Sequence, residues 1–202
     1  MINPYFEGII VEKLREEEHE SMKKQYAISD ELTSEDIKVI RRKLGFTQKE
    51  LAQFVHVSVK TIERWESEKK SITGPIVPLV KILNENPRLE QDLRVPEKKE
   101  LLRIWYMCKS DVCTIIDVNE RLRYIRIYNY TNDLLKRAFG RIENPTFEQY
   151  EEFLESRCFP RSRDKMKLML KELNIPFYEP LMIIEKTQGR MAEDDFWIRI
   201  ER

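Results

Sequence analysis

The spacing of apolar positions in residues 47–66 predicts two short helices joined by a tight turn. The apolar side of the first helix consists of Leu51, Ala52 and Val55, which share one face at helical spacing. Ile62 and Trp65, three residues apart, form the inward side of the second helix. The opposite side of the second helix is polar and carries Lys60, Thr61 and Arg64. A small residue such as Ala52 is suited to the point where two helices cross at a steep angle.

Both helices begin with residues that favour helix N-termini. Thr47 and Glu50 have the spacing of a capping box, in which each side chain bonds to the backbone N–H of the other residue. Ser58 is a suitable N-cap for the second helix, which we expect to continue to Lys69 or Lys70. The pattern therefore predicts a helix-turn-helix whose second helix presents polar side chains outward.

The flanking segments predict two more helices. Residues 34–44 have Ser34 as a candidate cap, an inward stripe of Ile37, Ile40 and Leu44, and Gly45 as the residue that ends the helix. The basic cluster of this helix, Lys38, Arg41, Arg42 and Lys43, is either solvated or contacts DNA phosphates. After Pro75, a strongly apolar helix extends to Asn86 and Pro87. It has more apolar residues than one face requires, so part of it is expected to meet a second subunit.

The second half of the chain has a sequence pattern that predicts strands as well as helices. Residues 101–107, 112–118, 123–128 and 196–200 read as strands, and residues 134–139, 146–156, 166–173 and 180–189 read as helices. The predicted fold class is α+β, with an all-helical helix-turn-helix domain followed by a small α+β domain that has an antiparallel sheet. We place an N-terminal arm at 1–31, the helix-turn-helix domain at 32–90, a linker at 91–99 and the α+β domain at 100–202.

Residues 32–89 resemble the lambda-repressor-like, or XRE, family of DNA-binding domains, and most closely the helix-turn-helix domains of bacterial antitoxins of the MqsA and HigA kind. The matching positions are Gln48, Glu50, Leu51, Ala52, Val57, Ser58, Thr61, Ile62, Arg64, Trp65 and Glu66. One departure is His56, where the family usually has Gly at a position that tends to need φ > 0. The C-terminal half loosely resembles modules attached to helix-turn-helix proteins in Gram-positive toxin–antitoxin-like operons.

The resemblance implies how DNA would be bound. The recognition helix, about residues 58–69, would enter the major groove, with Lys60 and Arg64 contacting bases. Gln48 would hold a phosphate and brace the recognition helix. Thr47, Ser58 and Thr61 are candidates for phosphate contacts or caps, and Lys69 completes the expected DNA-binding set. We expect a homodimer on a palindromic operator in double-stranded DNA.

Charge and composition limit how the protein can bind nucleic acid and in which compartment we expect it. The chain has 36 basic and 36 acidic residues, so any nucleic-acid binding depends on local charge placement. Residues 33–90 carry 11 basic and 8 acidic residues, which makes this stretch mildly basic. We expect no membrane span and no secretory signal, and the three cysteines suggest a reducing cytoplasm.

An enzyme is not expected, and neither a cofactor nor a metal site is predicted. His19 and His56 both lie outside the C-terminal half, so its cysteines, Cys108, Cys113 and Cys158, have no histidine nearby to activate them. A basic cluster in this half comprises Arg157, Arg161, Arg163, Lys165 and Lys167. It is either a solvated helix entry or a site for an acidic partner or nucleic acid.

Two functions from different classes fit these features. The first is a DNA-binding transcriptional regulator, an autoregulating repressor of the antitoxin type, with a toxin or other protein bound through residues 1–31 or 100–202. The alternative is an interaction or inhibitor protein derived from a phage or mobile element, whose helix-turn-helix only controls its own promoter. A pulldown from the host separates the two, because only the alternative predicts a target that is not a toxin.

Overall fold

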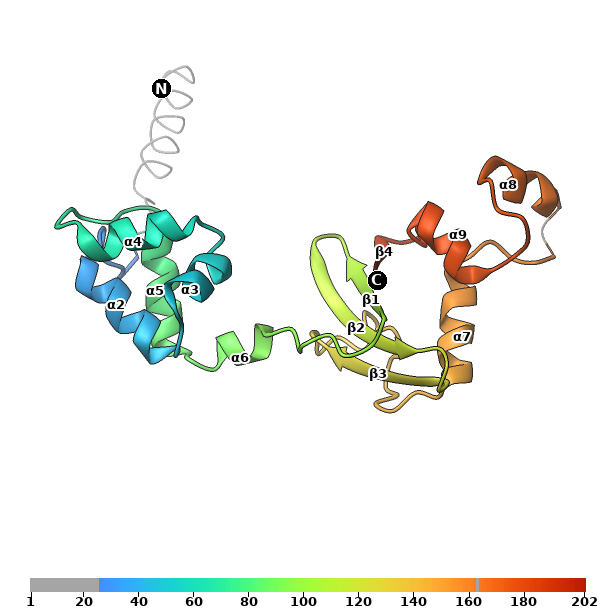
Figure 1. Ribbon diagram of the computed structural model, residues 1–202, viewed down its shortest axis with the longest axis horizontal. Coiled ribbons are helices and arrows are strands. Elements are labelled where there is room, and N and C mark those ends of the chain that lie inside the picture. The colour runs from blue at the N-terminus through green and yellow to red at the C-terminus, as the bar shows by residue number, and fades with distance from the viewer. Residues whose placement is uncertain (1–25, 163) are drawn as a thin grey trace, which may run out of the picture. The chain divides into compact units, whose positions relative to one another are not determined.

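The computed structural model describes residues 26–162 and 164–202. The chain divides into two compact units, one ending at Gln91 and the other starting at Asp92 (Figure 1). Most of the predicted N-terminal arm, residues 1–25, lies outside the described residues. No described helix has the length and apolar character that crossing a membrane requires.

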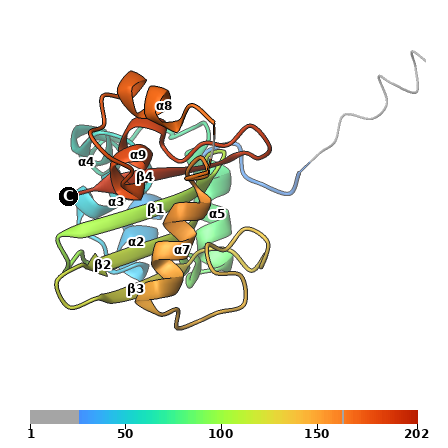
Figure 2. The ribbon, with the colours of Figure 1, turned by 90° about the vertical axis from the view of Figure 1, so that its right-hand side faces the viewer.

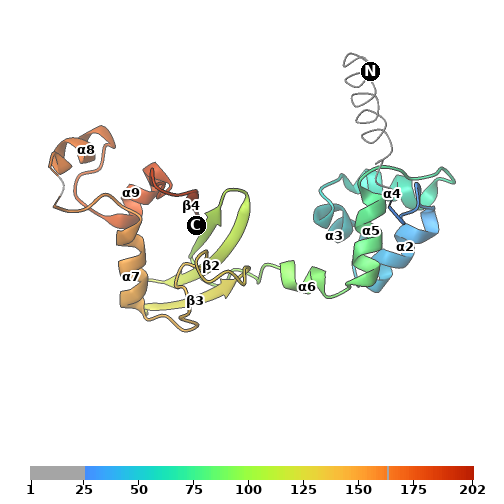
Figure 3. The same ribbon diagram turned by 180° about the vertical axis from the view of Figure 1, so that it is seen from behind.

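The N-terminal unit is helical. Its helices are α2 (Ser34–Lys43), α3 (Gln48–Phe54), α4 (Val59–Ser67), α5 (Ile76–Glu85) and the short α6 (Leu89–Leu93), which crosses the boundary between the units. Figure 3 shows α2 to α5 gathered around one centre. The buried residues at this centre include Ile37, Ile40, Leu51, Ala52, Ile62, Val77, Val80 and Leu83. The predicted inward stripes of these helices therefore form one core.

Two helix ends differ from the sequence prediction. Thr33, not Ser34, caps α2: its hydroxyl accepts from the Asp36 N–H at 3.3 Å, and Asp36 accepts from the Thr33 N–H at 2.7 Å. Helix α4 ends at Ser67, short of the predicted Lys69 or Lys70, because Glu68 is extended and Ile72 pairs with Leu32 in a β-bridge. This bridge draws the chain out of the helical path.

The C-terminal unit is an antiparallel sheet with helices. The strands are β1 (Leu102–Cys108), β2 (Asp111–Asn119), β3 (Tyr124–Asn129) and β4 (Phe196–Glu201), in the order β3-β2-β1-β4. The helices are α7 (Phe147–Ser156), α8 (Met166–Glu172) and α9 (Pro180–Thr187). The last strand returns to pair with β1. The predicted α+β class, with a helical domain before an antiparallel sheet, is confirmed.

One face of the sheet forms the core of this unit. Ile104, Ile116 and Ile198 point toward α7 and α9 and share a core with Phe153 and Ile184. Figure 2 shows these helices in front of the sheet. A further helix predicted at residues 134–139 is wrong, since the chain there makes only turns.

Most of the predicted linker, residues 91–99, is either helical or hydrogen-bonded to the C-terminal unit. Its first residues belong to α6. Tyr130 Oη donates to the Arg94 carbonyl and Arg103 Nη1 donates to the Pro96 carbonyl, both at 2.9 Å. Lys98 Nζ donates to the Glu201 carbonyl at 3.2 Å. Residues 94–98 are therefore fastened to the sheet of the C-terminal unit.

Arg157 is the clearest correction in this unit. The sequence suggested that Arg157 is solvated or binds an acidic partner or nucleic acid, whereas its side chain is buried and donates to the carboxylate of Asp194 at 2.6 and 3.0 Å. It also donates to the carbonyls of Gly189 and Phe196. The sequence offers no signal for this role, because the partners lie more than 30 residues away.

Candidate nucleic-acid interface

The turn between α3 and α4 requires one residue in the left-handed region. His56 occupies it with φ 55°, so the expected positive φ at this position is confirmed. Val57 N then donates to the Ala52 carbonyl at 2.9 Å, which closes the turn. Ala52 is buried, as expected for a small residue where two helices meet. This geometry fixes the direction in which α4 leaves the turn.

The N-termini of α3 and α4 are capped as predicted. Thr47 and Glu50 form a capping box, with contacts of 2.7 and 3.2 Å. The Ser58 hydroxyl accepts from the Thr61 N–H at 3.1 Å, and the Ser58 and Thr61 hydroxyls are 2.8 Å apart. These hydroxyls therefore define the start of α4, and each retains capacity for a further hydrogen bond.

The outward side of α4 carries the two cations that were expected to read bases. Lys60 and Arg64 are exposed and lie four residues apart on the helix. Neither side chain has a hydrogen-bond or ion-pair partner within residues 26–162 and 164–202. Arg64 also lines a hollow of about 400 Å³ beside Trp65. Trp65 itself is half-buried and packs against the core, as the sequence predicted.

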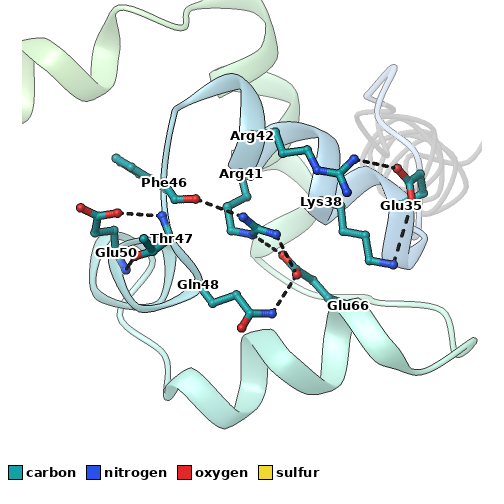
Figure 4. Close-up of polar contacts among 9 residues, drawn as sticks. All are labelled: Glu35, Lys38, Arg41, Arg42, Phe46, Thr47, Gln48, Glu50 and Glu66. Atoms are coloured by element: carbon teal, nitrogen blue, oxygen red, sulfur yellow. Dashed lines mark hydrogen bonds and ion pairs between the residues drawn. The ribbon is translucent and has the colours of Figure 1, made fainter.

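The inward side of α4 is held by a buried carboxylate. Glu66 is only 7 % exposed. Its oxygens accept from Arg41 Nε at 2.6 Å, Arg41 Nη2 at 3.1 Å and Gln48 Nε2 at 2.9 Å (Figure 4). Arg41 Nη1 also donates to the Phe46 carbonyl at 3.1 Å. This Arg41–Glu66–Gln48 cluster joins α2, α3 and α4 at one point and so sets the orientation of the recognition helix.

The electrostatics of the cluster favour the ionised pair. Burial alone would raise the pKa of Glu66, but the hydrogen bonds from Arg41 and Gln48 outweigh it, and the pKa lies below its usual value of 4.5. The hydrogen bond to Glu66 likewise raises the pKa of Arg41. A buried carboxylate with a bidentate arginine is among the stronger pairings in proteins.

The cluster corrects the reading of the first helix. Arg41 was expected to be solvated or to contact phosphate, yet it is committed to Glu66. Its neighbours Lys38 and Arg42 lie 4.0 and 3.6 Å from the carboxylate of Glu35. The burial of Glu66 was missed, although the sequence held a signal: Glu66 follows Ile62 by four residues and therefore lies on the inward face.

Two residues of the expected DNA-binding set need qualification. Gln48 braces the recognition helix through one N–H of its side-chain amide, which leaves the second N–H of that amide as a donor for a phosphate. Lys69 lies two residues beyond the end of α4 and is exposed. Lys69 was expected to extend the recognition helix; it instead belongs to the loop that leads to Ile72.

Cys113 and Cys158 are thiols rather than reactive thiolates. Burial raises the pKa of Cys158 to about 12 and also raises that of Cys113. All three cysteines are free. Within the described residues, no group of three or more His, Cys, Asp or Glu side chains is arranged to hold a metal ion.

Comparison with known proteins agrees with this geometry. Residues 37–78 match the family model described as helix-turn-helix, of the XRE type. The matched stretch contains α3, the turn and α4, and this family consists of DNA-binding regulators. No curated protein matches the chain. The N-terminal unit thus carries a DNA-binding helix-turn-helix domain.

Proposed function

We propose that this protein is a sequence-specific regulator of transcription that represses its own promoter, in the manner of an antitoxin. The observation that carries the proposal is the contrast between the two sides of α4. The inward side is fixed by the Arg41–Glu66–Gln48 cluster, while Lys60 and Arg64 point outward without partners in the described residues. A rigid helix with two free cations suits insertion into the major groove.

Arg64 is the proposed base reader. Its guanidinium can donate two parallel hydrogen bonds to the O6 and N7 atoms of a guanine, the commonest specific contact in the major groove. Lys60, one turn earlier, contributes a second base or phosphate contact. The hydroxyls of Thr47, Ser58 and Thr61, with Gln48 and Lys69, are proposed to hold the flanking phosphates, which position the helix but carry no sequence information.

A homodimer is part of the proposal, since two helix-turn-helix units then read two half-sites one helical turn apart. Helix α5 supports it, because Ile82 on this helix is 46 % exposed although the helix is largely apolar. Burial of such a side chain against a second copy would remove apolar surface from water.

The experiment uses the DNA upstream of the gene that encodes this protein. Gel shifts with the full chain should show a specific complex that excess random DNA does not displace. Arg64→Ala should weaken that complex by about 1–3 kcal/mol and leave binding to random DNA nearly unchanged.

Arg88→Ala is the matched control, because Arg88 is an exposed arginine after α5. Equal losses on specific and random DNA for Arg64→Ala would reduce Arg64 to a phosphate contact. Absence of any specific complex on the upstream DNA would overturn the autoregulatory role.

A further inference from the structure

The face of the sheet that points away from α7 and α9 carries two tryptophans. Trp105 on β1 lies opposite Arg199 on β4, and Trp197 precedes Arg199 by two residues, so that all three side chains belong to this face. Met107 pairs with Trp197 and lies two residues after Trp105 on β1, so it neighbours both tryptophans. Residues 94–98 contact Arg103 and Tyr130 on the same face and reach Glu201 through Lys98, while Arg199 is exposed.

Each indole ring is covered by an arginine. The guanidinium carbon of Arg199 lies 4.1 Å from the ring centre of Trp105, and that of Arg190 lies 5.1 Å from the ring centre of Trp197. We call these four residues the Trp–Arg patch. Distances below about 6 Å are those of cation–π contacts, which hold a guanidinium over the ring.

Hydrogen bonds fix both rings in place. Trp105 Nε1 donates to Glu201 Oε2 at 2.9 Å, and Trp197 Nε1 donates to the Lys109 carbonyl at 2.7 Å. The indoles are thus held by both their edges and their cross-strand neighbours. A stacking surface that is already oriented loses little entropy when a flat ligand binds to it.

The charge of the patch is uncompensated. Across the described residues, neither Arg190 nor Arg199 has an ion-pair partner. The nearby carboxylates are occupied, because Glu201 lies 3.8 Å from Lys98 and Asp195 lies 3.2 Å from Lys109. The two arginines therefore present positive charge above the indole rings of the two tryptophans.

We propose that the Trp–Arg patch binds single-stranded nucleic acid. Unpaired bases stack on aromatic rings and on arginine guanidinium planes, and the N–H groups of the guanidinium edges take phosphate oxygens. A duplex cannot use this surface in the same way, because its bases are already stacked on one another. An acidic protein would match the charge but would leave the stacking surfaces unused. The binding is expected to tolerate many sequences, since every base has a π face.

The test uses the full chain with Arg64→Ala, which removes the proposed base contact of the other unit. The probe is a fluorescein-labelled 15-nucleotide oligothymidine, followed by anisotropy. Arg190→Ala/Arg199→Ala should weaken binding roughly tenfold or more, within the range for lost stacking and cation–π contacts. Arg141→Ala is the matched control, because Arg141 is an exposed arginine of the loop between β3 and α7.

Two further measurements add to the comparison of variants. Two phosphate contacts predict that affinity falls roughly sevenfold between 50 and 200 mM salt. Stacking predicts that oligothymidine quenches tryptophan fluorescence, and that the double variant loses this quenching.

Binding without quenching, an equal loss of affinity for a duplex of the same length in the double variant, or an equal loss of oligothymidine affinity in Arg141→Ala would each overturn the proposal. Displacement of the oligonucleotide by polyglutamate at equal charge concentration would do so as well, because it would show a site for acidic protein. Since these outcomes concern the C-terminal unit alone, they leave the proposed regulatory function unaffected.

Discussion

The buried carboxylate of Glu66 offers the sharpest test of how the recognition helix is held. Glu66→Gln preserves the shape of the side chain and removes its charge. Loss of one partner from a fully buried ion pair costs about 3–5 kcal/mol. The Arg41 side chain is 19 % exposed, so water can hydrogen-bond to it in part when the charge of Glu66 is removed. We therefore expect the free energy of unfolding to fall by about 2 kcal/mol. In a unit of this size, that lowers the melting temperature by on the order of 10 °C.

The pH dependence follows from the lowered pKa of Glu66. A carboxylate with a depressed pKa in the folded state contributes its full stability above its unfolded pKa and loses it as the pH falls through the folded value. The advantage of the native protein over Glu66→Gln should therefore be complete at pH 7 and shrink below about 4.5, the ordinary value for this group.

Calorimetry of the full chain can follow the N-terminal transition, with Glu63→Gln as the control. Glu63 is exposed on the same helix and loses the same charge without disturbing the cluster. The reasoning fails if the two variants melt together, or if the difference between native protein and Glu66→Gln is constant from pH 7 to pH 3.

Other perturbations test single features. His56→Gly should stabilise the N-terminal unit by up to about 1 kcal/mol, whereas Gly45→Ala, at φ +70°, should destabilise it by a similar amount; thermal melts compare the pair. Arg157→Met should cost a few kcal/mol, since Asp194 and two carbonyls lose their donor, and denaturant titration would measure it. A fragment of residues 92–202 should melt higher than one of 97–202, which lacks the contacts of residues 94–96 with the sheet.

The elements that sequence predicted well depend on local rules. Capping boxes at Thr47 and Thr146 act over three residues, and both helices begin where expected. The strand at residues 123–128 was recognised because apolar and polar residues alternate along it, and the residue after the last helix, Gln188, lies close to the predicted end. Sequence also located the turn at His56, since the family resemblance indicated where a positive φ was needed.

The features that sequence missed depend on contacts between distant residues. The end of α4 is set by the bridge between Leu32 and Ile72, which no local sequence pattern predicts. Arg41 and Arg157 were predicted to be surface residues because a single arginine gives no sign of a carboxylate partner 25 or 37 residues away. The Trp–Arg patch was likewise invisible, since it exists only after β4 pairs with β1.

The central claim is that α4 reads a specific sequence of double-stranded DNA through Arg64. Selection of binding sites from a random double-stranded library tests it most directly, with the native chain and Arg64→Ala selected in parallel. We expect the native chain to enrich a palindromic motif with a guanine in each half-site, and Arg64→Ala to lose the preference at that position while keeping the rest. Enrichment of no motif, or of the same motif with the same guanine preference by both proteins, would contradict the account.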